Sequence, residues 1–167
     1  MPDLLTHVLL AYTVATLVAN RYHWLQPAYV TIAMVGALIP DMDHVSTLLP
    51  SQTVEAVLGI PFDWQGLQTG GVVLLVILIG TVLVKAAERR RVFALLCLGA
   101  FTHLFTDALI RVPEGRSQSI FFPVTLYQPP TPGLYLSTDI WPLAVTAVFA
   151  FFAWYLVRVN GTAEQNP

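Results

Sequence analysis

The chain has 167 residues, of which 56% are hydrophobic and only 11% are charged, with a net charge of -2 and a mean hydropathy of +0.67. A soluble domain usually carries about a quarter charged residues, so this composition excludes an ordinary water-facing surface. The small net charge and the lack of a basic stripe exclude a nucleic-acid partner. The one cysteine, Cys97, lies in an apolar run and excludes an internal disulfide.

Five apolar stretches approach the roughly 20 residues that a membrane-spanning helix needs. They cover residues 4–19, 22–40, 70–87, 92–110 and 140–159. The first has no basic residue before it and no small-residue cleavage site after it, so we expect a retained helix. Pro27 interrupts the second, which leaves a re-entrant segment as the alternative and would invert the later topology. The sequence predicts an all-α, polytopic bundle of about five transmembrane helices, one domain over residues 1–160 with a polar tail at 161–167.

The distribution of basic residues predicts the orientation, because cytoplasmic connections carry the excess of Lys and Arg. With five helices, one side holds Arg21, Lys85, Arg89, Arg90, Arg91 and Arg158, and the other holds Arg111 and Arg116. We therefore expect a multi-pass protein of the cell (inner) membrane. Its N-terminus and the connections 41–69 and 111–139 would be extracytoplasmic, and its C-terminus cytoplasmic.

Ionisable side chains that are costly in lipid gather at the predicted outer face, and such groups are functional candidates by default. They are His7, Asp41, Asp43, His44, Asp63, His103 and Asp107, with Gln68 beside them. His103 and Asp107 are four residues apart, which places both on one helix face. Such a pair binds a metal, orients the imidazole, or makes a single interhelical hydrogen bond in lipid.

The string Pro40-Asp41-Met42-Asp43-His44 follows a proline that ends the second helix. Three ligand-type side chains within four residues suit a divalent cation such as zinc, manganese or magnesium. The alternative is a solvated acidic helix end. The connection that follows contains no Lys or Arg that would neutralise the carboxylates.

The stretch 111–139 is rich in Gly and Pro and is too polar and broken to span a membrane. We expect a long extracytoplasmic loop that covers the site as a lid or lies at the lipid surface. Arg111 and Arg116 are candidates for binding an anionic group such as phosphate, and the alternative is anchoring at anionic lipid headgroups.

These residues resemble a family of membrane-bound, predicted metal-dependent hydrolases of the YdjM type. The resemblance rests on His7, the Pro-Asp-x-Asp-His string at 40–44, the His103–Asp107 pair, and Gly115 followed by Pro123. It implies metal ligation by His7, Asp41, His103 and Asp107, with Asp63 as a further ligand. It also implies a lipid-like substrate, because the family is likened to zinc phospholipases.

One part of the chain departs from the family pattern. Where the family has His-Arg-Gly-x-Thr-His-Ser, this sequence reads Asp63-Trp64-Gln65-Gly66-Leu67-Gln68-Thr69. Asp63 still suits a metal, whereas Gln68 is a poorer zinc ligand. We assign Gln68, with the two loop arginines, to substrate binding.

The leading hypothesis is an enzyme, a hydrolase that uses a divalent metal, with zinc favoured, at the extracytoplasmic membrane face. Its substrate would be lipid-like or a phosphoester, and Asp43 or His44 would act as general base or would orient the base. One alternative is a non-catalytic membrane protein that binds or moves a cation. The other is a degenerate hydrolase, because both histidines of the third family string are replaced.

Overall fold

The computed structural model describes residues 4–22 and 24–163. In that part the chain forms six α-helices and two 3₁₀ helices. In chain order they are α1 (Leu4–Ala19), α2 (Pro27–Leu38), η1 (Pro40–Thr47), α3 (Ser51–Leu58), η2 (Trp64–Gln68), α4 (Gly70–Leu83), α5 (Arg89–Asp107) and α6 (Trp141–Ala163). The all-α prediction is confirmed.

Helix ends follow the local sequence. α2 begins at Pro27, because proline has no amide hydrogen to lose at the first helical position. α2 stops at Leu38, and Pro40 begins η1. The predicted stretch 22–40 was therefore too long at both ends. α5 begins at Arg89 and ends at Asp107, three residues earlier at each end than predicted. α6 continues to Ala163, into the segment predicted as a tail.

Within the described residues, one helix is both long and apolar enough to cross a membrane, over Trp141–Val159 of α6. α1, α2 and α4 are apolar but have only 16, 12 and 14 residues. α5 has 19 residues but carries three arginines in its first turn. Length and composition thus identify a single span, and the count of about five stays a prediction.

Small residues bring α2 and α5 into close contact. A Cβ added to Gly99 would lie 1.9 Å from the Ala33 carbonyl oxygen, and one added to Gly36 would lie 2.4 Å from that of Leu96. Ala33 and Ala37 are fully buried in the same interface. Membrane helices commonly pack through such small residues, which let backbones approach. The close approach sets the α2 backbone against the middle of α5.

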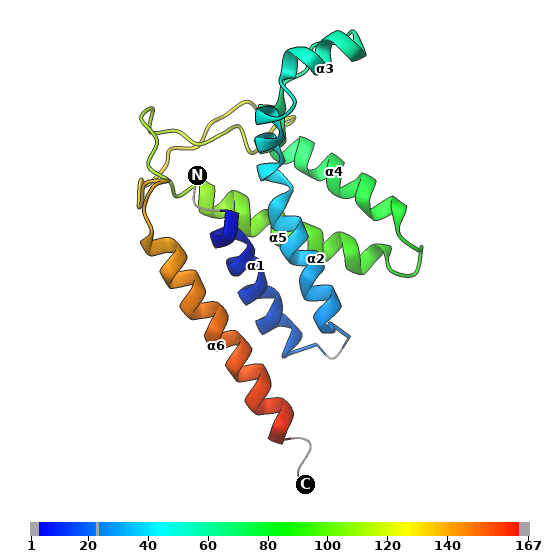
Figure 1. Cartoon of the computed structure of the whole chain (residues 1–167), viewed down its shortest axis with the longest axis vertical. Coiled ribbons are helices and arrows are strands. Elements are labelled where there is room, and N and C mark those ends of the chain that lie inside the picture. The colour runs from blue at the N-terminus through cyan, green and yellow to red at the C-terminus, as the bar shows by residue number, and fades with distance from the viewer. Residues whose placement is uncertain (1–3, 23, 164–167) are drawn as a thin grey trace.

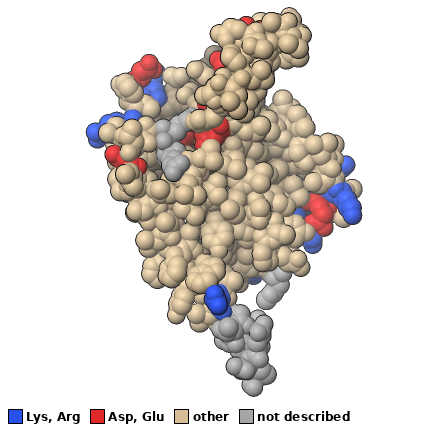
Figure 2. Space-filling view, in the orientation of Figure 1, with Lys and Arg blue, Asp and Glu red and all other residues tan. Residues whose placement is uncertain are grey.

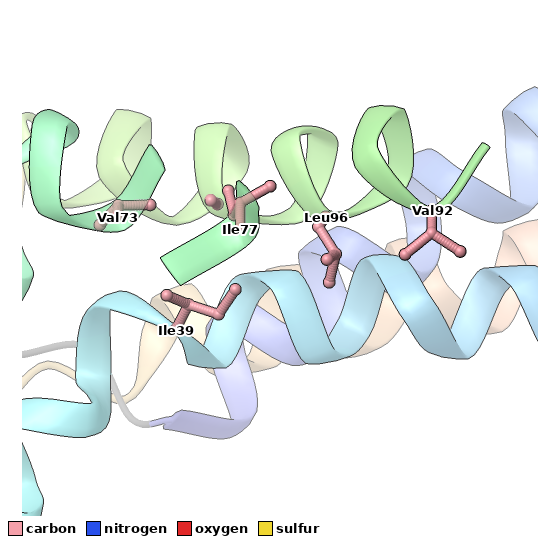
Figure 3. Close-up of a cluster of buried hydrophobic side chains, with 6 residues drawn as sticks. Ile39, Val73, Ile77, Val92 and Leu96 are labelled. Atoms are coloured by element: carbon pink, nitrogen blue, oxygen red, sulfur yellow. The ribbon is translucent and has the colours of Figure 1, made fainter. Parts of the chain in front are cut away.

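A hydrophobic cluster joins α4 to this pair of helices (Figure 3). It is formed by Ile39, Val73, Ile77, Val92, Leu96 and Ala100. α1 contacts α2 and α5 on one side and α6 on the other, so it lies in the middle of the bundle (Figure 1). α1 and η1, which carry His7 and Asp41, are therefore both packed against α5, which carries His103 and Asp107.

The molecule has two different ends. Figure 1 shows η1, η2, α3 and the loop between α5 and α6 at the end where α1 begins, and the end of α6 at the opposite end. On the face shown in Figure 2, charged side chains lie in the upper part, at the right-hand edge and near the lower end, and a broad area between them carries none. A band without charges between charged ends is the surface expected of a protein that sits in lipid.

Candidate metal centre

Two histidines from different helices stack face to face at the upper end of the bundle. His7 comes from α1 and His103 from α5, with ring centroids 3.7 Å apart and planes inclined by 16°. Both side chains are fully buried. The stacking sets their Nε2 atoms beside the carboxylate of Asp107, at 3.4 Å from Oδ1 for His7 and 3.1 Å from Oδ2 for His103.

The surroundings of His103 determine its tautomer. Its Nδ1 lies 2.6 Å from the carbonyl oxygen of Ala37, and a carbonyl only accepts, so Nδ1 carries the hydrogen. In the neutral ring the lone pair is then on Nε2, which faces Asp107 and lies 3.6 Å from Asp41 Oδ1. A lone pair facing two carboxylate oxygens is unfavourable unless a proton or a cation lies among them.

Thr106 determines the tautomer of His7 in the same way. Its hydroxyl lies 3.0 Å from the Thr102 carbonyl oxygen and 2.8 Å from that of His103, and donates its hydrogen there. The hydroxyl oxygen therefore accepts from His7 Nδ1, at 2.9 Å. The lone pair of neutral His7 is thus on Nε2, the atom that faces Asp107.

Three polar atoms at this place are buried without a hydrogen-bond partner among the described residues: His7 Nε2, Asp41 Oδ1 and Asp107 Oδ1. Buried polar atoms are rarely left unpaired, because desolvation without compensation costs free energy. The Asp41 side chain is only 2% exposed, and this burial raises the pKa of its carboxyl group. The unpaired atoms are the nitrogen and oxygen ligands that zinc prefers, so the donor set fits a divalent cation.

We call His7, Asp41, His103 and Asp107 the four-ligand cluster. The ligand atoms of His7, His103 and Asp107 all lie within 4.8 Å of one another. Asp41 joins them because its Oδ1 lies 3.6 Å from His103 Nε2. Two neutral imidazoles and two carboxylates would balance the charge of a divalent ion. The structure thus brings together four of the five residues that the sequence predicted as metal ligands.

A second group lies next to this cluster on η1, formed by Asp41, Asp43 and His44. His44 Nδ1 lies 3.0 Å from both the Asp41 carbonyl oxygen and Asp43 Oδ1. Gln68 of η2 donates from Nε2 to Asp43 Oδ2 at 2.6 Å. Asp41 belongs to both groups, so the predicted catalytic pair is adjacent to the predicted metal ligands.

The remaining predicted site residues lie elsewhere. Asp63 is the N-cap of η2, where Oδ1 accepts from the Gln65 amide at 3.0 Å, and the metal-ligand groups of the described residues do not include it. Arg111 and Arg116 are exposed in the loop after α5. The side chain of Arg111 packs over Gly133. Gln68 lies in the second group through its hydrogen bond to Asp43, and its role in substrate binding stays a prediction.

Sequence reasoning missed two side chains that support the site. Thr106 lies between His103 and Asp107 in the chain, and its position one turn after His103 was the available signal. Tyr135 has no such signal, because it comes from the loop and donates its hydroxyl to the Thr106 carbonyl at 2.7 Å. Tyr135 is buried, which raises the pKa of its hydroxyl and keeps it a donor.

A comparison with protein families bears on the N-terminal part of the site. Residues 1–59 match the family model of the YdjM inner membrane protein. The YdjM match spans α1, α2, η1 and α3, and so includes His7, Asp41, Asp43 and His44. It supports the resemblance expected from the sequence and indicates an inner-membrane protein. Neither a curated protein nor a solved structure matches the chain.

Proposed function

We propose that this protein is a metal-dependent hydrolase whose site opens at the extracytoplasmic face of the inner membrane. The observation that carries the proposal is the convergence of four buried ligand atoms, three of them without a hydrogen-bond partner in the described residues. Ionisable groups at such a position are functional far more often than structural, because an unpaired one destabilises the fold.

The four-ligand cluster would hold the cation through His7, Asp41, His103 and Asp107. A bound divalent ion supplies Lewis-acid activation of water and of the scissile bond. The chain orients the ligands: the Ala37 carbonyl and the Thr106 hydroxyl each occupy Nδ1 of one histidine and so direct Nε2 of both rings inward. Hydrogen bonds of this kind raise ligand basicity and fix the ring orientation.

His44 is suited to be the general base. Its Nδ1 donates to the Asp41 carbonyl, so Nε2 of the neutral ring has a free lone pair, and 55% of its side chain is exposed. Asp43 orients the ring through Oδ1 and is itself held by Gln68. A carboxylate that holds an imidazole in one tautomer is the arrangement of many acid-base dyads. Asp43 and Gln68 would therefore be positioning residues.

The substrate would be lipid-like or a phosphoester. The loop after α5 carries apolar side chains that remain exposed, among them Phe121, Val124 and Leu126, which are 52%, 91% and 74% exposed. Apolar side chains around a polar site favour a substrate with an apolar part. Arg111 and Arg116 in the same loop provide positive charge for an anionic group.

About five spans remain our proposed topology. α1 and α4 are about 24 and 21 Å long at 1.5 Å per residue, which is short of the roughly 30 Å hydrocarbon core. Local thinning of the bilayer, at a modest cost, would accommodate them. The arrangement would place Arg21, Lys85 and Arg158 on the cytoplasmic side, as basic residues prefer.

The first test is metal content of the purified full chain, compared with the double variant His103→Ala with Asp107→Ala. We expect near-stoichiometric zinc or manganese in the wild type and none in the double variant. Asp63→Asn is a matched control, because Asp63 is outside the cluster and asparagine still caps η2. Wild-type protein without metal after supplementation would contradict the proposal.

The second test is turnover on phosphoester and phospholipid substrates. His44→Ala should lower kcat by about 10² to 10⁴, the usual contribution of a general base, while the metal content stays unchanged. Metal without turnover in any variant would identify a degenerate hydrolase. Metal-dependent ion flux in proteoliposomes, without hydrolysis, would identify the cation-transport alternative instead.

A further inference from the structure

A groove lies at the end of the bundle away from the four-ligand cluster, between α2 and the α4–α5 turn. Its volume is about 400 Å³. Ile32, Leu83, Val84 and Val92 form an apolar floor, and Lys85 and Glu88 lie in its wall. An apolar floor beside charged groups suits an amphiphilic ligand, because its apolar part contacts apolar side chains and its charged part contacts charged ones.

The charge around the groove is strongly positive. Residues 85–91 contain one Lys and three Arg against a single Glu. Of the salt bridges in the described residues, the one in this segment joins Arg91 to Glu88 at 3.4 Å. Glu88 also accepts the hydroxyl of Tyr29. Glu88 is therefore already engaged, and it leaves the positive charge of Lys85 for a ligand.

Arg89 and Arg91 are held in place by other contacts. Arg89 donates to the carbonyl oxygens of Val82 at 3.0 Å and Val84 at 3.3 Å, which close the end of α4. Arg91 lies over the rings of Trp24 and Tyr29, with its guanidinium carbon 5.5 and 5.9 Å from the ring centres. Both arginines are thus held near the groove. Glu88 pairs with Arg91, and within the described residues no other carboxylate forms a salt bridge with either arginine. An anion at Lys85 would be attracted by all of them.

The apolar floor continues along α4. Leu75, Ile79, Val82 and Leu83 are between 55% and 82% exposed. Leu83 belongs to both the groove and this exposed strip. A ligand with a long apolar chain would follow the strip away from Lys85, whereas free phosphate would leave it uncovered.

We propose that this groove binds an anionic phospholipid, with its phosphate at Lys85 and an acyl chain on the floor of Ile32, Leu83 and Val92. Basic pockets between transmembrane helices on the cytoplasmic side are suited to such headgroups. This proposal rests on the proposed topology. The groove is separate from the four-ligand cluster, so failure of lipid binding and failure of metal-dependent hydrolysis are distinguished by different measurements.

The test is lipid retention by the full chain in native mass spectrometry. Equimolar phosphatidylglycerol and phosphatidylcholine with the same acyl chains are supplied, so that only the headgroup charge differs. We expect the wild type to retain phosphatidylglycerol about fivefold or more over phosphatidylcholine. Lys85→Gln should reduce that preference by about fivefold, the effect of one basic residue near an anionic headgroup. Lys85→Arg should restore most of it.

Arg21→Gln is the matched control, because it removes the same charge from an exposed position in the α1–α2 connection, outside the residues that line the groove. We expect it to leave the lipid preference unchanged. Equal retention of the two lipids would overturn the proposal, as would an unchanged preference in Lys85→Gln. Displacement of the lipid by water-soluble glycerophosphate would show a phosphate site without a role for the floor. A dimer that dissociates in Lys85→Gln, without any lipid preference, would assign the groove to a second copy.

Discussion

Thr106 is the residue whose hydroxyl decides which nitrogen of His7 faces the four-ligand cluster. It donates to backbone carbonyls within α5 and accepts from His7 Nδ1. Tyr135 adds a hydrogen bond to the Thr106 carbonyl from the loop. Three elements that are distant in sequence therefore meet at one hydroxyl-bearing residue.

Thr106→Val should weaken zinc binding by about 10- to 100-fold, the usual effect of removing a hydrogen bond that orients a metal-binding histidine. Valine keeps the shape of threonine and removes the hydroxyl, which accepts from His7 Nδ1 and donates to carbonyl oxygens within α5. Thr106→Ser keeps the hydroxyl and should retain near wild-type affinity. Competition with a chromophoric zinc chelator measures both. Equal affinity of the valine variant and the wild type would show that the hydroxyl does not orient His7.

Gln68→Leu should lower turnover by about tenfold and leave metal content unchanged. The substitution removes the donor at 2.6 Å from Asp43 Oδ2, and Asp43 in turn holds His44. Steady-state kinetics and metal analysis of the same preparation make the comparison. Loss of metal together with turnover would instead place Gln68 among the groups that support the four-ligand cluster.

At the scale of elements, the contact between α2 and α5 positions the site. Ala37 is one helical position after Gly36, whose missing side chain lets the α5 backbone approach. The same approach brings the Ala37 carbonyl to His103 Nδ1. The loop docks in a similar way, because the Gly70 amide donates to the Ile120 carbonyl at 3.1 Å, and a Cβ on Gly70 would lie 2.1 Å from that oxygen.

Gly99→Ala should destabilise the fold by about 1–3 kcal/mol, because its methyl group would overlap the Ala33 carbonyl and force the helices apart. Gly80→Ala is the control in the adjacent helix. Its added methyl group would meet Leu96 Cδ1 at 3.7 Å, an ordinary contact, and should be neutral or stabilising by up to about 1 kcal/mol. Unfolding in mixed detergent compares them. Equal stability of the two variants would contradict the role of this contact.

At the scale of the whole molecule, the four-ligand cluster joins α1, η1 and α5 around one point. A ligand that binds only the folded state stabilises it through mass action. Metal binding and global stability are therefore expected to be coupled in this protein, since the ligands come from elements that separate when the bundle unfolds.

Removal of the metal by a chelator should lower Tm, and zinc at 100 times its Kd should restore about 2.7 kcal/mol of stability. The double variant His103→Ala with Asp107→Ala should show no dependence on zinc. Thermal unfolding followed by tryptophan fluorescence measures both. A zinc-dependent Tm in the double variant would place the binding elsewhere.

The orientation is testable with single cysteines in a Cys97→Ser background. Gln52 and Gln118 are exposed in the two connections predicted to be extracytoplasmic, and Ala86 is exposed in the α4–α5 turn. An impermeant maleimide added to intact cells should label cysteines at the first two positions and not at Ala86. Labelling at Ala86, and not at Gln52 or Gln118, would favour the re-entrant alternative for the second segment, because one crossing fewer inverts the later topology.

The sequence by itself determined the all-α class, the apolar segments and the set of ligand-type side chains. These depend on composition and on spacing along the chain, which are local properties. Helix ends were less predictable around Pro27 and Pro40, because a proline either starts or stops a helix according to its neighbours.

The tertiary structure alone decided which of those side chains meet. Asp63 is as good a ligand as Asp41 in the sequence, yet it caps η2, whereas Asp41 is buried against His103. The Ala37 carbonyl supports the four-ligand cluster from the backbone, and Tyr135 supports it from the loop. Neither role is indicated by the residue type in the sequence. The position of the Ala37 carbonyl depends on helices that approach closely at Gly36 and Gly99, a property of packing between segments about sixty residues apart.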